Sequence, residues 1–255
     1  INVLSEFISN ENMLLARKQL ESHPNFTINF VILKDFDSSK FFLNSYMSIS
    51  TYYRFYIPQL FSHYDRILYL DSDLIVDADI SDFASLDFDD KLAICSPSPF
   101  IRNKVLKGDD EKFSLNYFTH VLKMPDPLQY FNAGVMLYNI KKMNEIDITT
   151  KLFEALEDIK EPFLQDQDIL NSVLSNNGGV KLISSKYNMT RTFVITAKRL
   201  FLERLKEIFR ISKKNNWFFI YHYVGKDKPW MTKRSDGLLF VKYAKMSPFY
   251  KQIFK

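Results

Sequence analysis

Glycine and cysteine are scarce in this 255-residue chain, and each shortage excludes a class of site. The 6 glycines form neither a G-x-G-x-x-G stretch nor a Walker A stretch, so the sequence contains no common glycine-rich phosphate loop. The one cysteine, Cys95, cannot form a disulfide within the chain, which is typical of proteins in a reducing compartment. Because Cys95 lies in the apolar run at 92–95, we expect a buried structural thiol rather than a nucleophile.

Long apolar runs are also absent, and none approaches the length of a transmembrane helix. The chain opens at Ile1 without a methionine, so a lost signal peptide stays an open alternative. Because a single cysteine is typical of a reducing compartment, we expect the protein in the cytoplasm.

Positive charge is concentrated at one end of the chain. Residues 1–197 hold 19 Lys and Arg against 26 Asp and Glu, whereas residues 198–255 hold 15 against 4. This basic segment predicts an anionic partner, such as a membrane surface, a phosphorylated substrate or nucleic acid, although such charges can also only solvate helices. No nucleic-acid motif accompanies the charge, so we expect no nucleic-acid partner.

Strands alternate with helices along the sequence, which predicts an α/β fold with a mostly parallel, mixed sheet. Apolar residues make up 46% of the chain, which is enough for a sizeable core. Apolar runs predict strands at 1–7, 26–33, 66–71, 92–96, 131–139, 180–183 and 217–221. Amphipathic stretches predict helices at 10–21, 48–61, 79–86, 111–123, 149–159, 165–174 and 197–212, the first of them capped by Ser9 or Asn10.

The stretch R-I-L-Y-L-D-S-D-L-I-V at 66–76 places two carboxylates, Asp71 and Asp73, between two apolar runs. Ligand sites of open α/β sheets collect at the carboxyl ends of the strands. Acidic groups between hydrophobic runs are costly unless their charge is compensated, and a divalent cation with oxygen ligands would do so. The pattern therefore favours a metal site, with an acidic loop that binds nothing as the alternative.

Polar residues also stand at the ends of three later apolar runs, namely Asn132-Ala133-Gly134, Asp166-Gln167 and His222. Two Asp and one His make a plausible site for Mn²⁺ or Mg²⁺. A lone His after a strand is more often structural than a ligand. Here His222 precedes Gly225 and Lys228, which provide a permissive backbone position and a cation that attracts phosphate.

Taken together, six stretches of the chain resemble glycosyltransferase family 8, in the order that the family has them. This family of retaining enzymes includes bacterial lipopolysaccharide galactosyl- and glucosyltransferases and glycogenin. The matching stretches are S-T-Y-Y-R at 50–54, L-Y-L-D-S-D at 68–73, F-N-A-G-V-M-L-Y-N at 131–139, Q-D-Q-D-I-L-N at 165–171, Y-N at 187–188 and H-Y-V-G-K-D-K-P-W at 222–230.

The resemblance implies a GT-A fold, a Rossmann-like domain that binds a nucleotide-sugar. It implies that Asp71, Asp73 and His222 hold Mn²⁺, with Ser72 between the two acids, and that Gly225 and Lys228 contact the donor diphosphate. It further implies that Arg54, Asn132 and Ala133 face the donor sugar or its phosphates. The catalytic candidates, Asp166 and Gln167, would lie against the sugar ring.

The resemblance also implies a reaction, which is transfer of glucose or galactose from a UDP-sugar to a saccharide or lipid-linked saccharide of the bacterial cell envelope. Retention can arise through a covalent intermediate on Asp166 or Gln167, or through attack from the face that the diphosphate leaves. Because a glutamine amide is a poor nucleophile, we favour same-face attack, with Asp166 as an orienting group. Aromatic and basic residues of the C-terminal segment suit peripheral contact with the inner face of the membrane.

The chain departs from the family pattern in two places. It lacks the family's first apolar strand with its Asp-x-Asn-Tyr segment, so we expect an N-terminally incomplete GT-A domain at 1–235 and a basic helical segment at 236–255. Ser96-Pro97-Ser98-Pro99 stands where some relatives carry an acidic residue, which puts a specific acceptor contact in doubt. Two alternative functions stay open, a non-catalytic saccharide-binding module and a nucleotidyltransferase, although the lack of a glycine-rich loop argues against the latter.

Overall fold

A computed structural model describes residues 1–21, 23–34, 41–43, 48–190, 218–232 and 237–253. The basic helix predicted at 197–212 lies outside these residues. The chain divides into two compact units, one formed by Ile1–Arg54 with Pro229–Lys255 and the other by Phe55–Lys228. The predicted boundary at 235/236 and the predicted loss of a first strand stay predictions.

The first unit contains a parallel strand pair joined by a helix. Strand β1 (Asn2–Ser5) pairs with β2 (Asn29–Ile32), and α1 (Asn10–Leu20) connects them. The predicted cap is confirmed, because the Ser9 hydroxyl accepts a hydrogen bond from the backbone N–H of Asn12 at 3.2 Å. The same unit contains α10 (Leu238–Ala244) and α11 (Tyr250–Ile253), while the 3-10 helix η2 (Ile49–Tyr56) spans the boundary along the chain.

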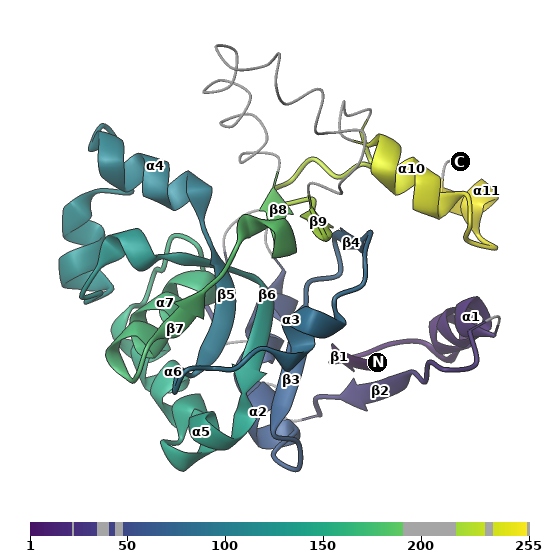
Figure 1. The fold of residues 1–255 in the computed structure, drawn as a ribbon, viewed down its shortest axis with the longest axis horizontal. Coiled ribbons are helices and arrows are strands. Elements are labelled where there is room, and N and C mark those ends of the chain that lie inside the picture. Colours follow the sequence, from purple (N-terminus) through teal and green to yellow (C-terminus); the bar gives the residue numbers. More distant parts are fainter. Residues whose placement is uncertain (22, 35–40, 44–47, 191–217, 233–236, 254–255) are drawn as a thin grey trace. The chain divides into compact units, whose positions relative to one another are not determined.

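The second unit is built on a four-stranded sheet in the order β3-β6-β5-β7 (Figure 1). These strands are β3 (Arg66–Leu70), β6 (Phe131–Asn139), β5 (Ala93–Pro97) and β7 (Val180–Leu182). Three of them run in one direction, as expected, but β6 pairs antiparallel with both of its neighbours. The beginning of β6 therefore lies at the edge of the sheet where β3 and β5 end.

A second, three-stranded sheet in this unit has the order β4-β9-β8. Strand β4 (Leu74–Val76) pairs antiparallel with β9 (Ile220–His222), and β8 (Met189–Thr190) pairs parallel with β9. Because β4 follows β3 after only three residues, the two sheets meet at the turn that carries the acidic pair.

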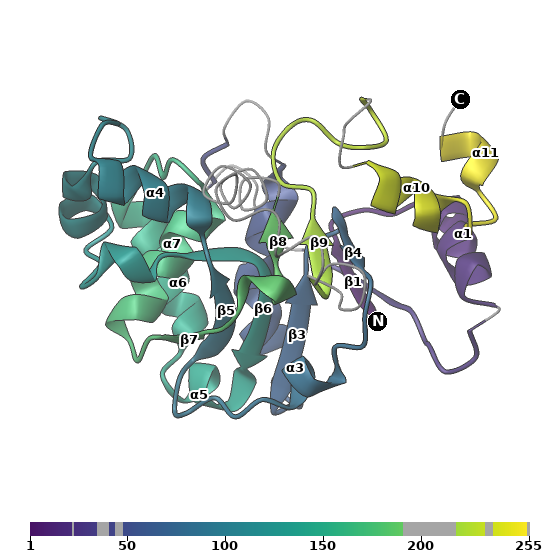
Figure 2. The same cartoon turned by 45° about the horizontal axis from the view of Figure 1, so that its top comes forward.

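Helices cover the four-stranded sheet on one side, where α6 lies beside α7, and α5 and α7 pack against β6 (Figures 1 and 2). Their bounds are α5 (Ile140–Glu145), α6 (Ile148–Asp158) and α7 (Asp166–Asn176). The same unit also contains the helices α2 (Ile57–Leu60) and α3 (Ser81–Ser85) and the short 3-10 helices η4 (Pro127–Gln129) and η5 (Ser185–Tyr187). Among the described residues, no helix combines the length and the apolar character needed to cross a membrane.

Of the helix predicted at 111–123, only the part at Tyr117–Val121 forms, as a short π-helix η3, and the chain also forms the helix α4 (Pro99–Lys107), which was not predicted. The capping residues of α4 were visible in the sequence. Ser98 caps the helix through its side chain, proline stands at the first helical position, and Gly108 ends the helix with a φ of 64°. The polar character of residues 100–130 concealed this local signal.

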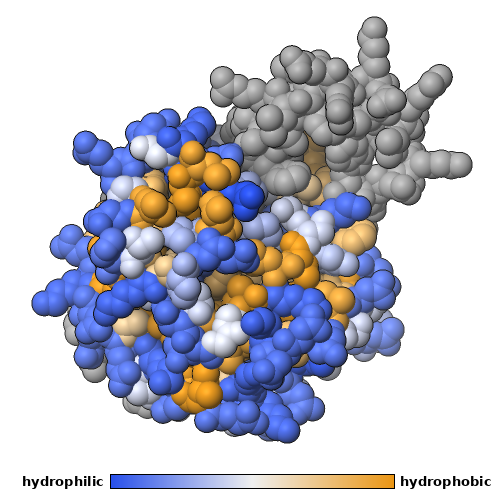
Figure 3. Space-filling view, turned by 60° about the vertical axis from the view of Figure 1, so that its left-hand side comes forward, coloured by the Kyte–Doolittle hydropathy of each residue, from blue (hydrophilic) through white to orange (hydrophobic). Residues whose placement is uncertain are grey.

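Helix α4 buries one side only. Ile101 is fully buried, whereas Phe100 and Leu106 are 38% and 61% exposed. The space-filling view from this side of the molecule shows apolar side chains gathered between hydrophilic ones (Figure 3). Some exposed apolar side chains are normal on a protein surface, and nothing in the structure shows what covers these.

The central strands β5 and β6 of the four-stranded sheet are largely buried on both faces, and alternate residues of each strand point to opposite faces. One face carries a core cluster of Ile94, Val135 and Leu137, joined by Phe83 of α3 and Ile220 of β9. The intervening residues of the same strands are also fully buried, including the thiol of Cys95. This burial fixes the positions of the strand ends, where the polar residues of the candidate site lie.

Candidate active site

Three predicted metal ligands converge at the edge where β3 ends. Asp71 follows β3, Asp73 precedes β4, and His222 is the last residue of β9. Pairing of Leu74 with His222 brings β9 to the acidic turn. One ligand atom of each of these three side chains lies within 4.8 Å of the other two.

Short contacts define this cluster. His222 Nε2 lies 3.0 Å from Asp73 Oδ1 and 3.5 Å from Asp71 Oδ2, and the imidazole is only 3% exposed. The other oxygen of Asp71, Oδ1, accepts a hydrogen bond from the Tyr69 hydroxyl at 2.6 Å. Ser72, between the two acids, is exposed.

Lys228 adds positive charge to the same cluster. Its ammonium pairs with Oδ2 of Asp73 and donates a hydrogen bond to the carbonyl oxygen of Tyr223 at 2.8 Å. Burial alone would raise the pKa of Asp73, but hydrogen bonds and charges from His222 and Lys228 outweigh it and lower the pKa to about 2. Asp73 is therefore a carboxylate, and an acceptor only, at neutral pH.

Gly134 makes the close approach of the cluster to β6 possible. Its carbonyl oxygen accepts a hydrogen bond from the Asp71 N–H at 2.8 Å. A Cβ atom on Gly134 would lie 2.1 Å from Cε1 of His222 and 2.7 Å from Oδ2 of Asp71. Any side chain here would fill the space that these two ligands occupy, so the position requires glycine.

These residues fit a divalent cation. Two carboxylates and one imidazole with convergent ligand atoms are a donor set that Mn²⁺ or Mg²⁺ accepts. Gly225 lies between His222 and Lys228 with a φ of 88° and with no atom near the position of a Cβ. This φ lies in the left-handed region that favours glycine, and the predicted contact of Gly225 with a diphosphate stays a prediction.

A shift in strand register sets the position of Asn132 and Ala133. Strand β5 pairs Cys95 with Met136 and then Ser96 with Asn132, so three residues of β6 are skipped. Such irregularities bend a strand and reorient its side chains. Gln167 Oε1 accepts hydrogen bonds from the Asn132 side-chain amide and from the Ala133 N–H, both at 3.0 Å.

Asp166 and Asp168 begin α7, and only Asp166 was predicted as a site residue. Both carboxylates are buried. Asp168 accepts hydrogen bonds from the hydroxyls of Tyr130 and Tyr117 at 2.5 and 2.6 Å and from the Leu164 N–H at 2.8 Å. Burial raises the pKa of Asp168 above its ordinary value, and these three donors oppose the increase.

Four polar residues that sequence reasoning did not assign to the site are connected to it, namely Tyr117, Tyr130, Asp168 and Asn188. Asn188 lies between the metal cluster and Asn132, because its side chain contacts Nδ1 of His222 at 2.9 Å and donates to Oδ1 of Asn132 at 2.7 Å. The motifs that include Asp168 and Asn188 were visible in the sequence, but the contacts between them were not.

Arg54, predicted to face the donor, ends the segment Ile1–Arg54 of the first unit. It is 4% exposed, and its Nε donates a hydrogen bond to the Thr51 carbonyl at 3.0 Å. Its predicted contact with the donor stays a prediction.

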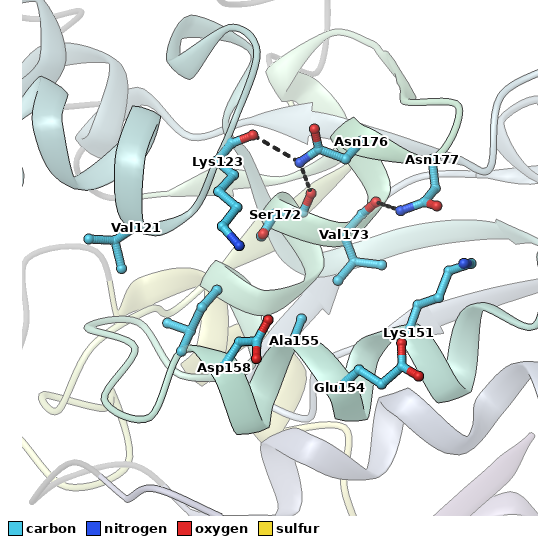
Figure 4. Close-up of a pocket in the computed structure, with 11 residues that line it drawn as sticks. Val121, Lys123, Lys151, Glu154, Ala155, Asp158, Ser172, Val173, Asn176 and Asn177 are labelled. Atoms are coloured by element: carbon cyan, nitrogen blue, oxygen red, sulfur yellow. Dashed lines mark hydrogen bonds between the residues drawn. The ribbon is translucent and has the colours of Figure 1, made fainter.

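A separate cavity of about 330 Å³ lies at the far end of α7 (Figure 4). Three chain segments line it, and two of them supply its lysines and acids, Lys123, Lys151, Glu154 and Asp158. Because an 11-residue helix is about 16.5 Å long, this cavity is distinct from the site at the first turn of α7.

Curated proteins with related sequences are bacterial glycosyltransferases. The chain is 30% identical to a lipopolysaccharide 1,2-glucosyltransferase of Escherichia coli over 187 residues, which is 71% of this chain and 50% of that protein. It is 27% identical to a lipopolysaccharide 1,3-galactosyltransferase of Salmonella typhimurium over 238 residues, 90% of this chain and 63% of that protein. The chain thus spans between half and two thirds of the length of these relatives.

Solved structures of two glycosyltransferases are also similar to this chain. The galactosyltransferase LgtC, in complex with donor and acceptor sugar analogues, matches with a TM-score of 0.78 and 26% identity, over 97% of this chain and 84% of that chain. The bifunctional glycosyltransferase WbbM matches with a TM-score of 0.78 and 25% identity, over 100% of this chain and 45% of that chain. These matches confirm the expected α/β fold.

The similarity to one family extends over most of the chain. A sequence profile of glycosyl transferase family 8 matches residues 5–234, which is most of the chain. The resemblance expected from six short motifs is thereby confirmed, and the chain belongs to glycosyltransferase family 8.

Proposed function

We propose that this chain transfers glucose or galactose, with retention of configuration, from a UDP-sugar to a saccharide acceptor. The observation that carries the proposal is the convergence of Asp71, Asp73 and His222 within 4.8 Å, beside Lys228. The names of two relatives, a glucosyltransferase and a galactosyltransferase, support a hexose donor.

Asp71, Asp73 and His222 would hold Mn²⁺ or Mg²⁺. When bound, the cation supplies positive charge for the diphosphate that leaves the sugar. Lys228 would add a second positive charge, because its ammonium can exchange Asp73 for a phosphate oxygen. The exposed backbone at Gly225 would approach the diphosphate, and Ser72 would lie beside it.

In the proposed reaction, the bond between the anomeric carbon and the diphosphate oxygen breaks, and the electron pair leaves with the UDP. A bond from the acceptor hydroxyl oxygen to the anomeric carbon forms on the same face. The acceptor proton passes to an oxygen of the leaving diphosphate. Asn132, Ala133 and Gln167 would lie against the sugar, with Asp166 as an orienting group.

The contacts of Gln167 support same-face attack over a covalent intermediate. Both lone pairs of Oε1 are used, because this oxygen accepts hydrogen bonds from Asn132 and from Ala133. An attack by Oε1 on the anomeric carbon would break both bonds in addition to using a weak nucleophile. Among the described residues, Gln167 Nε2 donates to Tyr130 only, so its second hydrogen can donate to the sugar.

For the acceptor, we propose a saccharide or lipid-linked saccharide of the cell envelope, such as lipopolysaccharide, reached at the inner face of the cytoplasmic membrane. The relatives' names and the basic C-terminal segment support this proposal. Lys242, Lys245 and Lys251 supply positive charge in the described part of that segment.

The decisive experiment incubates the protein with UDP-glucose or UDP-galactose and Mn²⁺ and follows release of UDP. We expect metal-dependent turnover and its loss, by about 100-fold or more, in Asp71→Asn, since removal of one electrostatic group commonly costs that much. Asp79→Asn, a change at an acid of the same chain segment that is outside the cluster, should keep full activity. An active Asp71→Asn enzyme that ignores metal would refute the proposal.

The position of the label separates the alternatives. Label from the sugar should reach the acceptor, whereas label from the nucleotide would indicate a nucleotidyltransferase. Binding of a glycan that needs neither nucleotide nor metal would instead support a non-catalytic module.

A further inference from the structure

Five hydrogen bonds join His222 to the buried carboxylate of Asp168 in one continuous chain. The chain begins at His222, whose Nδ1 contacts Asn188 Oδ1 at 2.9 Å, and Asn188 Nδ2 donates to Asn132 Oδ1 at 2.7 Å. Asn132 Nδ2 then donates to Gln167 Oε1 at 3.0 Å. Gln167 Nε2 donates to Tyr130 Oη at 3.2 Å, and Tyr130 Oη donates to Asp168 Oδ1 at 2.5 Å. Every link from Asn188 onward donates in the same direction. The chain therefore connects His222, a predicted metal ligand, with Gln167, which is predicted to face the sugar.

Asp168 sets the direction at one end of this chain. Oxygen–oxygen distances of 2.5 and 2.6 Å are typical of hydroxyls that donate to an ionised carboxylate, which can only accept. Since the Tyr130 proton points to Asp168, its oxygen can only accept from Gln167. The Gln167 nitrogen must then face Tyr130, and the Gln167 oxygen must face Asn132.

Backbone donors confirm the same direction in the middle of the chain. The Ala133 N–H donates to Gln167 Oε1, and the Gly134 N–H donates to Asn132 Oδ1, both at 3.0 Å. A backbone N–H cannot reverse its role, so neither amide can flip without losing a bond. The Ala133 N–H therefore holds the oxygen of the Gln167 amide, while Asp168, through Tyr130, holds its nitrogen.

At the other end of the chain, Asn188 presents its oxygen to Nδ1 of His222, because its nitrogen is used by Asn132. The same direction of donation therefore extends from Asp168 to the residue that contacts His222.

We propose that Asp168 is a positioning residue that acts through Tyr130 on Gln167. It holds the Gln167 amide with its nitrogen toward Tyr130. The catalytic consequence rests on the proposed glycosyl transfer, whereas the orientation of Gln167 does not. Hydrogen bonds that polarise one another along such a chain strengthen the effect.

The structure offers a matched control for this proposal. Tyr117 also donates to Asp168, through the other carboxylate oxygen, but it is not part of the chain to Gln167. Tyr130→Phe and Tyr117→Phe each remove one hydroxyl from the same buried carboxylate. If Asp168 only stabilised the fold, the two variants would behave alike.

The test compares both variants by NMR in the metal-free protein and by kinetics. In Tyr130→Phe we expect the side-chain amide signals of Gln167 to shift, and kcat to fall about 10-fold with a KM for the UDP-sugar near the wild-type value. Both variants should lower the melting temperature by a similar amount. Tyr117→Phe, however, should leave kcat and the Gln167 signals unchanged. Equal effects of the two variants on Gln167 and on kcat would overturn the proposal.

Asp168→Asn supplies a second variant if Tyr130→Phe fails to fold. Its amide can donate to Tyr130, so the chain loses its acceptor-only end. The side-chain amide signals of Gln167 in the metal-free protein should then shift from their wild-type positions. Unchanged Gln167 signals would contradict the proposal, while an inactive wild type with the expected shifts would refute only the proposed transfer.

Discussion

Gly134 and His222 approach so closely that a Cβ atom on Gly134 would lie 2.1 Å from Cε1 of His222. Glycine is therefore the only residue at this position that leaves His222 beside Asp71 and Asp73. The backbone of β6 forms one wall of the proposed metal site, and the three ligands form the other.

The variant Gly134→Ala should bind Mn²⁺ at least about 10-fold more weakly, because His222 must move away from the two carboxylates. Titration followed by the EPR signal of free Mn²⁺ measures this affinity. Gly108→Ala is the matched control, since it has a φ of 64° but no atom near the added Cβ. It should lose about 1 kcal/mol of stability and keep the metal affinity. Unchanged Mn²⁺ binding in Gly134→Ala would contradict the predicted site.

The lowered pKa of Asp73 makes the stability of the metal-free protein depend on pH. A carboxyl group whose pKa falls from 3.8 in the unfolded chain to about 2 stabilises the fold above the higher value. That contribution is lost as the pH falls toward 2. We expect it to be on the order of 2 kcal/mol at neutral pH, with about 1 kcal/mol lost between pH 5 and pH 3.

Denaturant unfolding of the wild type and of Asp73→Asn, at a series of pH values, isolates this contribution. The difference in free energy of unfolding between the two proteins should narrow as the pH decreases over this range. A difference that stays constant would show that His222 and Lys228 do not stabilise the ionised form of Asp73.

Lys228 should affect binding of the donor more than folding. Replacing it with methionine keeps much of the aliphatic chain but removes the charge that would contact the diphosphate. We expect kcat/KM for the UDP-sugar to fall about 10- to 100-fold, since charged hydrogen bonds contribute roughly 1.5–3 kcal/mol. Lys226→Met, at an exposed lysine two residues earlier, should have kinetics close to those of the wild type. Equal kinetics of the two variants would remove Lys228 from the site.

The buried thiol of Cys95 should not react in the folded protein. Burial raises the pKa of Cys95 well above its ordinary value and keeps reagents away from it. A thiol reagent such as DTNB should therefore label the wild type only in denaturant. Rapid labelling of the native protein would contradict the position of Cys95 on β5.

Much of the site could be predicted from local sequence patterns. Asp71 and Asp73 stand out because an acidic pair between two apolar runs has few explanations. Ser9 and the strands around it were predicted from capping and from apolar periodicity, and the structure has them. His222, in contrast, was assigned through the resemblance, because a single histidine after a strand carries little information.

Other features could not be predicted from local patterns. An apolar strand has the same pattern in either direction, so nothing in F-N-A-G-V-M-L-Y-N reveals that β6 runs antiparallel to β3 and β5. Asp166 and Asp168 look equivalent in the sequence, because both are acids in the first turn of the same helix. Only packing decides that the Asp168 carboxylate meets the hydroxyls of Tyr117 and Tyr130.

The α/β fold, the acidic turn after a buried strand and the family can all be recognised from residue order and local periodicity. Which polar groups meet depends on how the strands pack in three dimensions. His222 reaches Asp73 through pairing of β4 with β9, and Gln167 is connected to Asp168 through Tyr130. Hydrogen bonds act over about 3 Å, so they depend on strand direction and register, which residue order alone does not specify.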